Sequence, residues 1–148
     1  SSDLTGNIPE APNTHIRQLN INNYPEYLTF FLKDNPESGT TDWLYDYFND
    51  IVAKGYIFGV YEDNQLVCAT DAPSMPYLQD KVVEIGISTL NEFRNRGYAA
   101  QSVCAMLQYL ILNGKTPIYS CASTNIASQM LAQKTGFTKL ADVISISL

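Results

Sequence analysis

The stretch KVVEIGISTLNEFRNRGYAAQSVCAMLQYLILN, residues 81–113, decides the fold. Residues 81–88 are rich in β-branched side chains, which is typical of a buried strand. A polar loop over residues 89–96 follows, and Gly97 opens a helix that runs to Asn113. The helix carries apolar residues at the spacing of one buried face: Ala100, Val103, Cys104, Leu107, Leu110 and Ile111. The stretch therefore predicts a strand, a turn and a helix in succession.

The junction between strand and helix, residues 94–99 with the sequence RNRGYA, has the features of an anion site. The first turn of a helix has unpaired N–H groups and the positive end of the helix dipole, which suit a phosphate. Gly97 permits a close approach of the backbone, and Ala99 keeps the first turn slim. An ordinary strand–loop–helix joint with solvated arginines would contain the same residues, so the flanking segments decide between the two interpretations.

Length and composition are those of one globular domain, with 148 residues of which 45% are hydrophobic. Residues 1–13 are polar and predict an extended lead-in, which leaves residues 14–148 as the domain. No apolar run approaches the ~18 residues of a membrane span, so we expect no membrane partner. Three cysteines without a C-x-x-C pair favour a reducing, cytoplasmic setting, and the single histidine, His15, argues against a metal site.

Charge is distributed unevenly along the chain. Residues 1–92 hold fourteen of the fifteen acidic residues, whereas residues 93–148 hold five of the nine basic residues and one acid, Asp142. One interpretation is that these charges are solvated and have no special role. The other is a bipolar molecule whose basic half binds a polyanion and whose acidic half binds a cation such as a protonated amine. A net charge of −6 makes nucleic acid a poor partner.

Hydrophobic periodicity and turn residues predict the remaining elements. They are a strand at 15–21, helices at 24–33 and 41–53, hairpin strands at 55–61 and 65–70, a strand at 116–121, a helix at 125–135 and a last strand within 137–148. Thr41 is the expected cap of its helix, and Gly114 ends the helix that Gly97 opens. The order β-α-α-β-β-β-α-β-α-β predicts an α+β fold, with a mixed, mostly antiparallel sheet and helices on both faces.

Arg94-x-x-Gly97-x-Ala99, placed between a strand and a helix, resembles the acyl-CoA pyrophosphate loop of the GNAT N-acetyltransferase superfamily. Asn125-x-x-Ser128 and the later Gly-Phe pair are similar to the second signature of that family, whose Asn contacts the pantetheine arm. The element order is also that of the GNAT fold. Residues 84–89, EIGIST, and the segments around both motifs most resemble a bacterial branch that includes antibiotic self-resistance acetyltransferases.

The resemblance implies acetyl-CoA as co-substrate, no metal, and a site on the chain's second half. The residues that it assigns to cofactor binding are Ile87, Thr89, Arg94, Asn95, Arg96, Gly97, Tyr98, Ala99, Asn125 and Ser128. In GNAT enzymes a backbone N–H on the splayed, bulged central strand stabilises the thioester oxygen, which places that donor near residues 87–89. In many members of the family a tyrosine acts as general acid for the leaving thiolate, and this chain has Ala132 at that position. The general acid therefore stays open: it is a water, a tyrosine such as Tyr119, or no group at all.

Glu84 is the candidate general base, because it is the carboxylate within the central strand and an amine must lose a proton to attack a thioester. Partial burial would raise its pKa towards a useful value, whereas the alternative is a Glu84 that faces solvent or pairs with a basic neighbour. Asp71 is a second candidate base. Four aromatic residues could line an acceptor pocket: Trp43, Tyr45, Tyr47 and Tyr77. Of these we expect Trp43 and Tyr47 to be core residues instead.

These features together predict an acetyl-CoA-dependent N-acetyltransferase that acts on a primary amine of a small cationic molecule, as a monomer or homodimer. Two other functions fit the same fold and cofactor. The first is a non-catalytic acyl-CoA-binding or sensor module, which Ala132 keeps open. The second is a protein or peptide N-terminal acetyltransferase, which differs in its acceptor groove.

Overall fold

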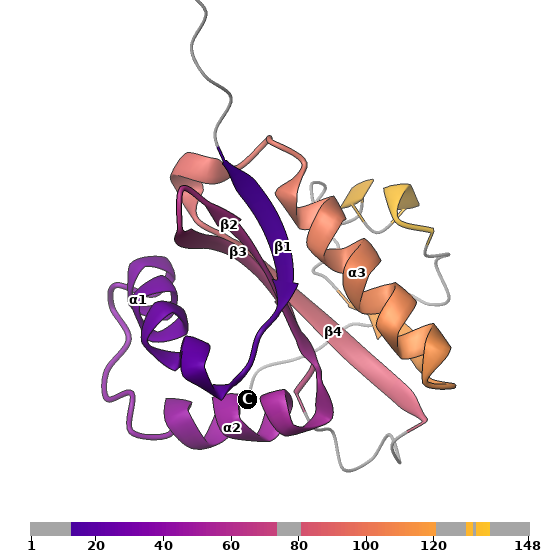
Figure 1. The fold of residues 1–148 in the computed structure, drawn as a ribbon, viewed down its shortest axis with the longest axis horizontal. Helices are drawn as coiled ribbons and strands as arrows, with labels where there is room; N and C mark the ends of the chain where they lie inside the picture. The colour runs from indigo at the N-terminus through magenta and orange to yellow at the C-terminus, as the bar shows by residue number, and fades with distance from the viewer. Residues whose placement is uncertain (1–12, 74–80, 121–129, 132, 137–148) are drawn as a thin grey trace, which may run out of the picture.

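The computed structural model describes residues 13–73, 81–120, 130–131 and 133–136, and it places a twisted sheet between two layers of helices (Figure 1). The strands are β1 (Thr14–Gln18), β2 (Ile57–Glu62), β3 (Gln65–Asp71), β4 (Val82–Thr89) and β5 (Thr116–Tyr119). The helices are α1 (Tyr24–Asp34), α2 (Leu44–Lys54) and α3 (Tyr98–Leu112), with short 3₁₀ turns η2 (Ile21–Asn23) and η4 (Asn91–Phe93).

The strands lie in the order β1-β2-β3-β4-β5. All neighbours are antiparallel except β4 and β5, which are parallel. Asp63 and Asn64 join β2 to β3 with φ of 49° and 67°, the positive values that a tight two-residue hairpin turn needs. The predicted α+β class and the order of elements as far as β5 are therefore confirmed. Residues 130–131 and 133–134 are helical, within the helix predicted at 125–135, and the predicted last strand lies outside the described residues.

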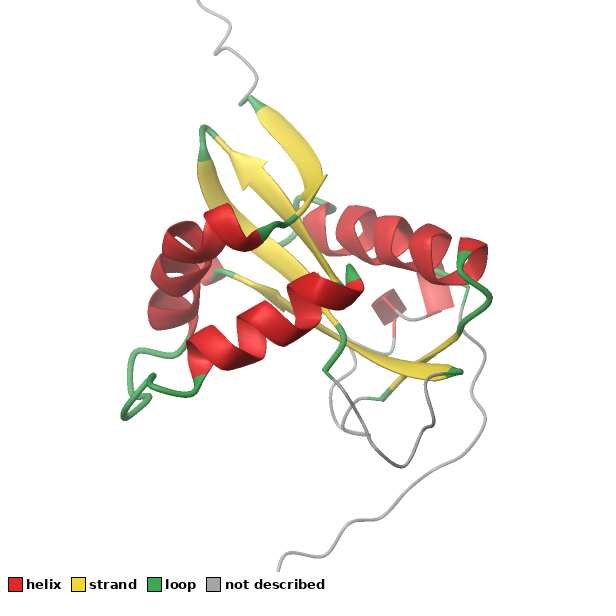
Figure 2. Cartoon of the chain, turned by 60° about the horizontal axis from the view of Figure 1, so that its bottom comes forward, coloured by secondary structure: helices red, strands yellow, loops and turns green. Residues whose placement is uncertain are grey.

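The two faces of the sheet have separate cores. Helices α1 and α2 cover one face, where Phe30, Leu44 and Phe48 pack against residues of β2 and β3. Helix α3 covers the opposite face, where Val103 and Met106 pack against β4 (Figure 2). Because side chains alternate along a strand, successive residues of β4 face opposite helical layers. This alternation decides which residues of β4 can meet a ligand from which side.

Three details differ from the sequence predictions. The first strand ends at Gln18, since residues 21–23 form η2, which Asn20 caps by accepting a hydrogen bond from the Asn22 amide at 2.9 Å. Helix α2 begins at Leu44 with Trp43 as its N-cap, so Thr41 is not the cap. The buried stripe of α3 comprises Tyr98, Ser102, Val103, Met106 and Leu110, so it is rotated relative to the predicted face, and both Cys104 and Ile111 are exposed.

None of the helices within the described residues has the length and apolar character needed to cross a bilayer. Cys68 and Cys104 are free thiols, the first buried and the second exposed, and Cys121 lies outside the described residues. Cys68 is packed between β3 and α3, where its thiol lies 3.5 Å from the Ser102 hydroxyl.

Candidate functional site

The site centres on β4, whose two halves have different neighbours. Residues 82–85 pair with β5, and the last of these pairs is Ile85 with Tyr119. Residues 86–89 pair with β3 on the other side. Strand β4 therefore continues for four residues beyond the point where its pairing with β5 ends, and that edge of β4 is open among the described residues.

The direction of the amides on this open edge follows from the antiparallel ladder. The Leu90 amide donates to the Val67 carbonyl at 3.0 Å, so even-numbered residues of β4 exchange hydrogen bonds with β3. The N–H groups of Ile87 and Thr89 consequently point away from β3, towards the edge that β5 has left. These are the two strand residues that the sequence predicts as cofactor contacts. The two amides form a row of donors along the gap.

The bulge expected in this strand is not seen in the described pairings. The register of β4 runs without a shift against both β3 and β5, and the shift in the sheet falls between Val60 and Tyr61 of β2. The donors are free of strand pairing for a simpler reason, which is that β5 ends four residues earlier than β4.

The turn before α3 is open to solvent. Gly97 is the N-cap residue, with φ 80° and ψ 5°, and Asn95 also has a positive φ of 64°. Residues 94–97 are exposed, and a Cβ built on Gly97 would meet nothing within 4 Å. The first hydrogen bond of the helix runs from the Gln101 amide to the Gly97 carbonyl at 3.2 Å, so the amides of the preceding residues lie at a free helix end. Backbone donors at this end face open space, which is the requirement for a bound phosphate.

The two arginines of the loop have different partners. Arg96 Nη1 donates to both carboxylate oxygens of Glu62 at 2.8 Å, and its guanidinium lies 5.0 Å from the centre of the Phe93 ring. Arg94 Nε donates to the Thr89 carbonyl at 3.3 Å, and its side chain is otherwise exposed. Glu62 is buried at the end of β2, so Arg96 ties the loop to the sheet with much of its charge neutralised. The sequence missed Glu62, because 34 residues separate it from Arg96.

Tyr98 and Ala99 anchor the start of α3. The Tyr98 side chain is 6% exposed and packs with Val60, Val67 and Cys68 between helix and sheet. Ala99 is partly buried against the same cluster. Tyr98 can therefore offer a ligand its backbone and not its ring, because the ring is part of the core. Asn125, Ser128 and the side chain of Ala132 lie outside the described residues.

Glu84 lies on the sheet face opposite α3. Its neighbours Val83 and Ile85 are buried under α3, so the alternation turns Glu84 towards the side of α1 and α2. The carboxylate is half-buried, and its Oε1 accepts a hydrogen bond from the Ser120 hydroxyl at 2.5 Å. Sequence reasoning missed Ser120, which follows β5. The candidate base thus faces the side of the sheet covered by α1 and α2, opposite the side covered by α3.

Asp71 shares this face with Glu84. It is directly opposite Gly86 in the β3–β4 register, and its Oδ2 accepts a hydrogen bond of 2.5 Å from the Tyr47 hydroxyl on α2. Burial raises the pKa of the Asp71 carboxyl, although the bond from Tyr47 opposes that shift. Burial and the neighbouring Asp71 also raise the pKa of Tyr47 above its usual value. The two groups form one hydrogen-bonded unit between α2 and β3, on the same face of the sheet as Glu84.

The aromatic residues divide between core and surface. Tyr47 is half-buried against the α1–α2 core, in keeping with the predicted structural role. Trp43 is 51% exposed, so the expectation that it is core is wrong, and the reason is its place at the exposed N-cap of α2. Tyr45 is 48% exposed, and Tyr77 lies outside the described residues.

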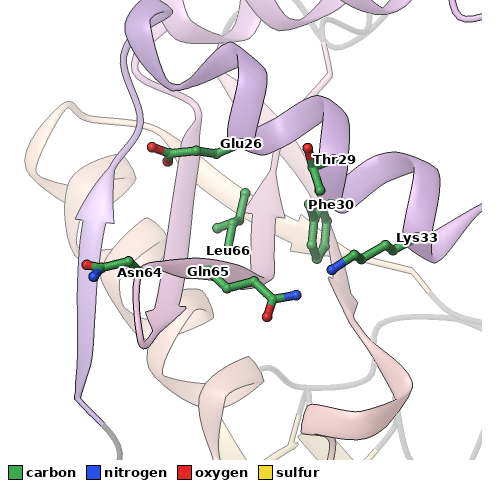
Figure 3. A pocket seen from close by; sticks show the side chains of 7 residues that line it. All are labelled: Glu26, Thr29, Phe30, Lys33, Asn64, Gln65 and Leu66. Atoms are coloured by element: carbon green, nitrogen blue, oxygen red, sulfur yellow. The ribbon is translucent and has the colours of Figure 1, made fainter.

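A separate small pocket of about 190 Å³ lies between α1 and the β2–β3 turn (Figure 3). Seven residues line it: Glu26, Thr29, Phe30, Lys33, Asn64, Gln65 and Leu66. It contains none of the residues predicted for the cofactor or for catalysis. It is also smaller than the roughly 300–1,000 Å³ of typical ligand sites, so it is not the candidate site.

Residues 10–138 match the family model of the acetyltransferase (GNAT) domain. That match covers most of the sequence, and the chain belongs to the GNAT acetyltransferase family. No curated protein is similar enough in sequence to count as a match.

Solved structures with the same fold include three with informative ligands. The aminoglycoside N-acetyltransferase AAC(6')-Iy, in complex with CoA, has a TM-score of 0.75 at 23% identity, covering 95% of this chain and 98% of that one. An aminoglycoside acetyltransferase from an uncultured soil metagenomic sample, in complex with sisomicin, has a TM-score of 0.71 at 13% identity, covering 91% and 95%. The putative acetyltransferase yncA from Salmonella typhimurium, with acetyl-CoA, has a TM-score of 0.70 at 16% identity, covering 86% and 81%. At these identities the likeness shows the fold alone.

Proposed function

We propose that this chain is an N-acetyltransferase that moves the acetyl group of acetyl-CoA to a primary amine of a small cationic molecule. The observation that carries the proposal is the open edge of β4 beside the exposed start of α3. The N–H groups of Ile87 and Thr89, alternate residues of β4, point to that edge without a strand partner. The Gly97 turn lies a few residues further along the chain. A thioester on a long phosphorylated arm needs donors at both places.

The pyrophosphate would lie against the backbone of residues 95–99, with Arg94 as the nearby cation. Arg96 contributes by fixing the loop through Glu62. The arm would then run along the open edge of β4, where the Ile87 or Thr89 amide donates to the thioester oxygen as it gains negative charge. Asn125 and Ser128, on the second motif, are proposed contacts of the pantetheine arm.

In the chemical step the amine nitrogen attacks the thioester carbonyl carbon, the C–S bond breaks, and the CoA thiolate leaves. Glu84 accepts the proton that the amine loses, directly or through one water, because it faces the acceptor side of the strand that holds the thioester. Ser120, which donates to Glu84, orients the carboxylate. A thiolate is already a good leaving group, so the proposal assigns no general acid. Holding both substrates on one strand supplies much of the remaining acceleration.

The acceptor side supports a cationic substrate. Glu84 and Asp71 are both on this face, and most of the chain's acidic residues are in the segments that build it. The aminoglycosides bound or modified by fold neighbours are amines of this kind. Their likeness agrees with a small cationic acceptor and with the bacterial self-resistance branch that the motifs resemble.

The test is thiol release from acetyl-CoA with a panel of small amines and N-terminal peptides, with the acetylated product identified by mass. We expect release that depends on the amine and saturates with a small cationic acceptor. If acetyl-CoA binds and no acceptor accelerates release, the chain is a binding module instead. Acceleration by peptides alone would assign it to N-terminal acetyltransferases.

A further inference from the structure

We propose that Asp71, held by the Tyr47 hydroxyl, binds a second ammonium group of the acceptor, so that the site selects diamines over monoamines. This inference rests on the proposed acetyl transfer at Glu84 and adds the substrate class of the same site. It assigns Asp71 to recognition and leaves proton transfer to Glu84.

The spacing of the two carboxylates suits a molecule that carries two ammonium groups several bonds apart. Asp71 is opposite Gly86, and Glu84 stands two residues before Gly86 on the same face of β4. Such diagonal neighbours in an antiparallel pair are about 7–8 Å apart. One carboxylate can therefore meet the amine that reacts while the other meets an ammonium group several bonds away on the same molecule.

Gly86 places no side chain between the two carboxylates. A Cβ at this position would lie 3.3 Å from Asp71 Oδ1, which is closer than an ordinary contact. Oδ1 is thus the oxygen on the side of Gly86, whereas Oδ2 is the one bonded to Tyr47. The hydrogen bond from α2 holds the carboxylate with one oxygen directed towards the strand that carries Glu84.

Among the described residues no basic side chain forms an ion pair with Asp71. A carboxylate that is largely removed from water is costly to ionise, and burial raises the pKa of Asp71 accordingly. An ammonium group that enters the acceptor face would supply the missing positive charge. The uncompensated carboxyl is therefore better suited to binding a cation than to stabilising the fold.

An exposed aromatic side chain packs against Tyr47, the partner of Asp71. Trp43 packs against Tyr47 with ring centres 6.0 Å apart and against Phe31 at 5.6 Å, in both cases edge to face. Its indole is 51% exposed, which is unusual for the largest apolar side chain. Trp43 contacts the ring of Tyr47, whose hydroxyl donates to Asp71, and an exposed aromatic ring attracts an ammonium group through cation–π attraction. The surroundings of Asp71 thus agree with its proposed ligand.

The experiment compares kcat/KM for linear diamines and for monoamines of the same chain length in wild type, Asp71→Asn, Tyr47→Phe and a charge-matched control, Asp46→Asn. Asp46 is exposed on α2 next to Tyr47, so its replacement removes the same charge from the surface of the same helix. Thermal unfolding and acetyl-CoA affinity by calorimetry verify that each variant is folded and still loads its co-substrate.

We expect Asp71→Asn to lower kcat/KM about 10–100-fold for diamines and less than about twofold for monoamines, as for a lost charge-assisted hydrogen bond. Tyr47→Phe should lower the preference for diamines less, and Asp46→Asn should leave it unchanged. An equal loss for both amine classes in Asp71→Asn would overturn the inference while leaving acetyl transfer in place. A wild-type protein that acetylates monoamines as well as diamines would also overturn the inference. If none of the amines is acetylated, the proposed function itself is refuted.

Discussion

Replacement of Gly97 by Asp tests the cofactor loop most directly. Gly97 adopts the left-handed conformation with φ 80°, is exposed, and has no atom within 4 Å of the point where a Cβ would stand, so a new side chain would displace no protein group. Its effect on the fold is therefore limited to backbone strain, about 1–2 kcal/mol for a residue other than glycine. Gly97→Asn is the matched control, because Asn tolerates this conformation and has the shape of Asp without its charge.

The expected loss of affinity follows from electrostatics. Two unit charges 4 Å apart interact by about 1 kcal/mol in water and by about 4 kcal/mol near a protein surface. Gly97 is exposed, so the lower value applies, and a pyrophosphate carries about two charges near the loop. The penalty specific to Asp is then about 2 kcal/mol, which is roughly 30-fold in the Kd of acetyl-CoA relative to Gly97→Asn.

Calorimetric titration of both variants with acetyl-CoA measures this ratio. The difference between Asp and Asn should shrink as salt rises from low to physiological ionic strength, since exposed charges are screened. Thermal unfolding should show that the two variants lose similar stability. Equal affinity of the Asp and Asn variants at low salt would show that no phosphate approaches Gly97, and the proposed position of the cofactor would be wrong.

Three further outcomes are expected. Glu84→Gln should lower kcat far more than acetyl-CoA affinity and should alter the alkaline rise of the rate profile; a wild-type profile would remove Glu84 from the mechanism. Glu62→Gln should lower the free energy of unfolding by about 1–2 kcal/mol and should weaken acetyl-CoA binding, because the loop loses its ion pair with β2. Tighter binding would contradict this and would mean that the released Arg96 contacts phosphate. Burial raises the pKa of Asp71 above the 3.8 of an exposed carboxyl, so the stability that its protonated form contributes is complete below about pH 3.8 and is lost as pH rises through the higher folded value. Asp71→Asn should therefore gain stability over wild type as pH increases above about 4 in thermal unfolding, and a constant difference would contradict this.

Much of the fold could be predicted because its signals are local. The β-branched run of β4, the hairpin of β2 and β3 and the glycines that flank α3 each depend on signals within a few residues, and the structure contains all three. Boundaries were harder where two local preferences compete. Asn20 caps a 3₁₀ turn and so shortens β1, and Trp43 precedes α2 where Thr41 had been expected to cap it.

The candidate site was predictable only in part, since its sequence motif names residues and not their partners. The loop was found from Gly97 and its flanking arginines, yet the sequence treats Arg94 and Arg96 alike. Only the folded chain brings Glu62 to Arg96 and leaves Arg94 on the surface. Ser120, which lies beside Glu84, likewise comes from a distant part of the chain, directly after β5. Such contacts span more than 30 residues and have no signature in the local pattern.

By itself the sequence determined the order of strands and helices and the position of the Gly97 turn, because hydrophobic periodicity and glycine conformation act over short distances. Tertiary structure alone decided that β5 ends before β4, that the Ile87 and Thr89 amides face the resulting gap, and that Asp71 and Glu84 share one face. Those relations depend on strand register, which is set by the packing of both helical layers against the sheet.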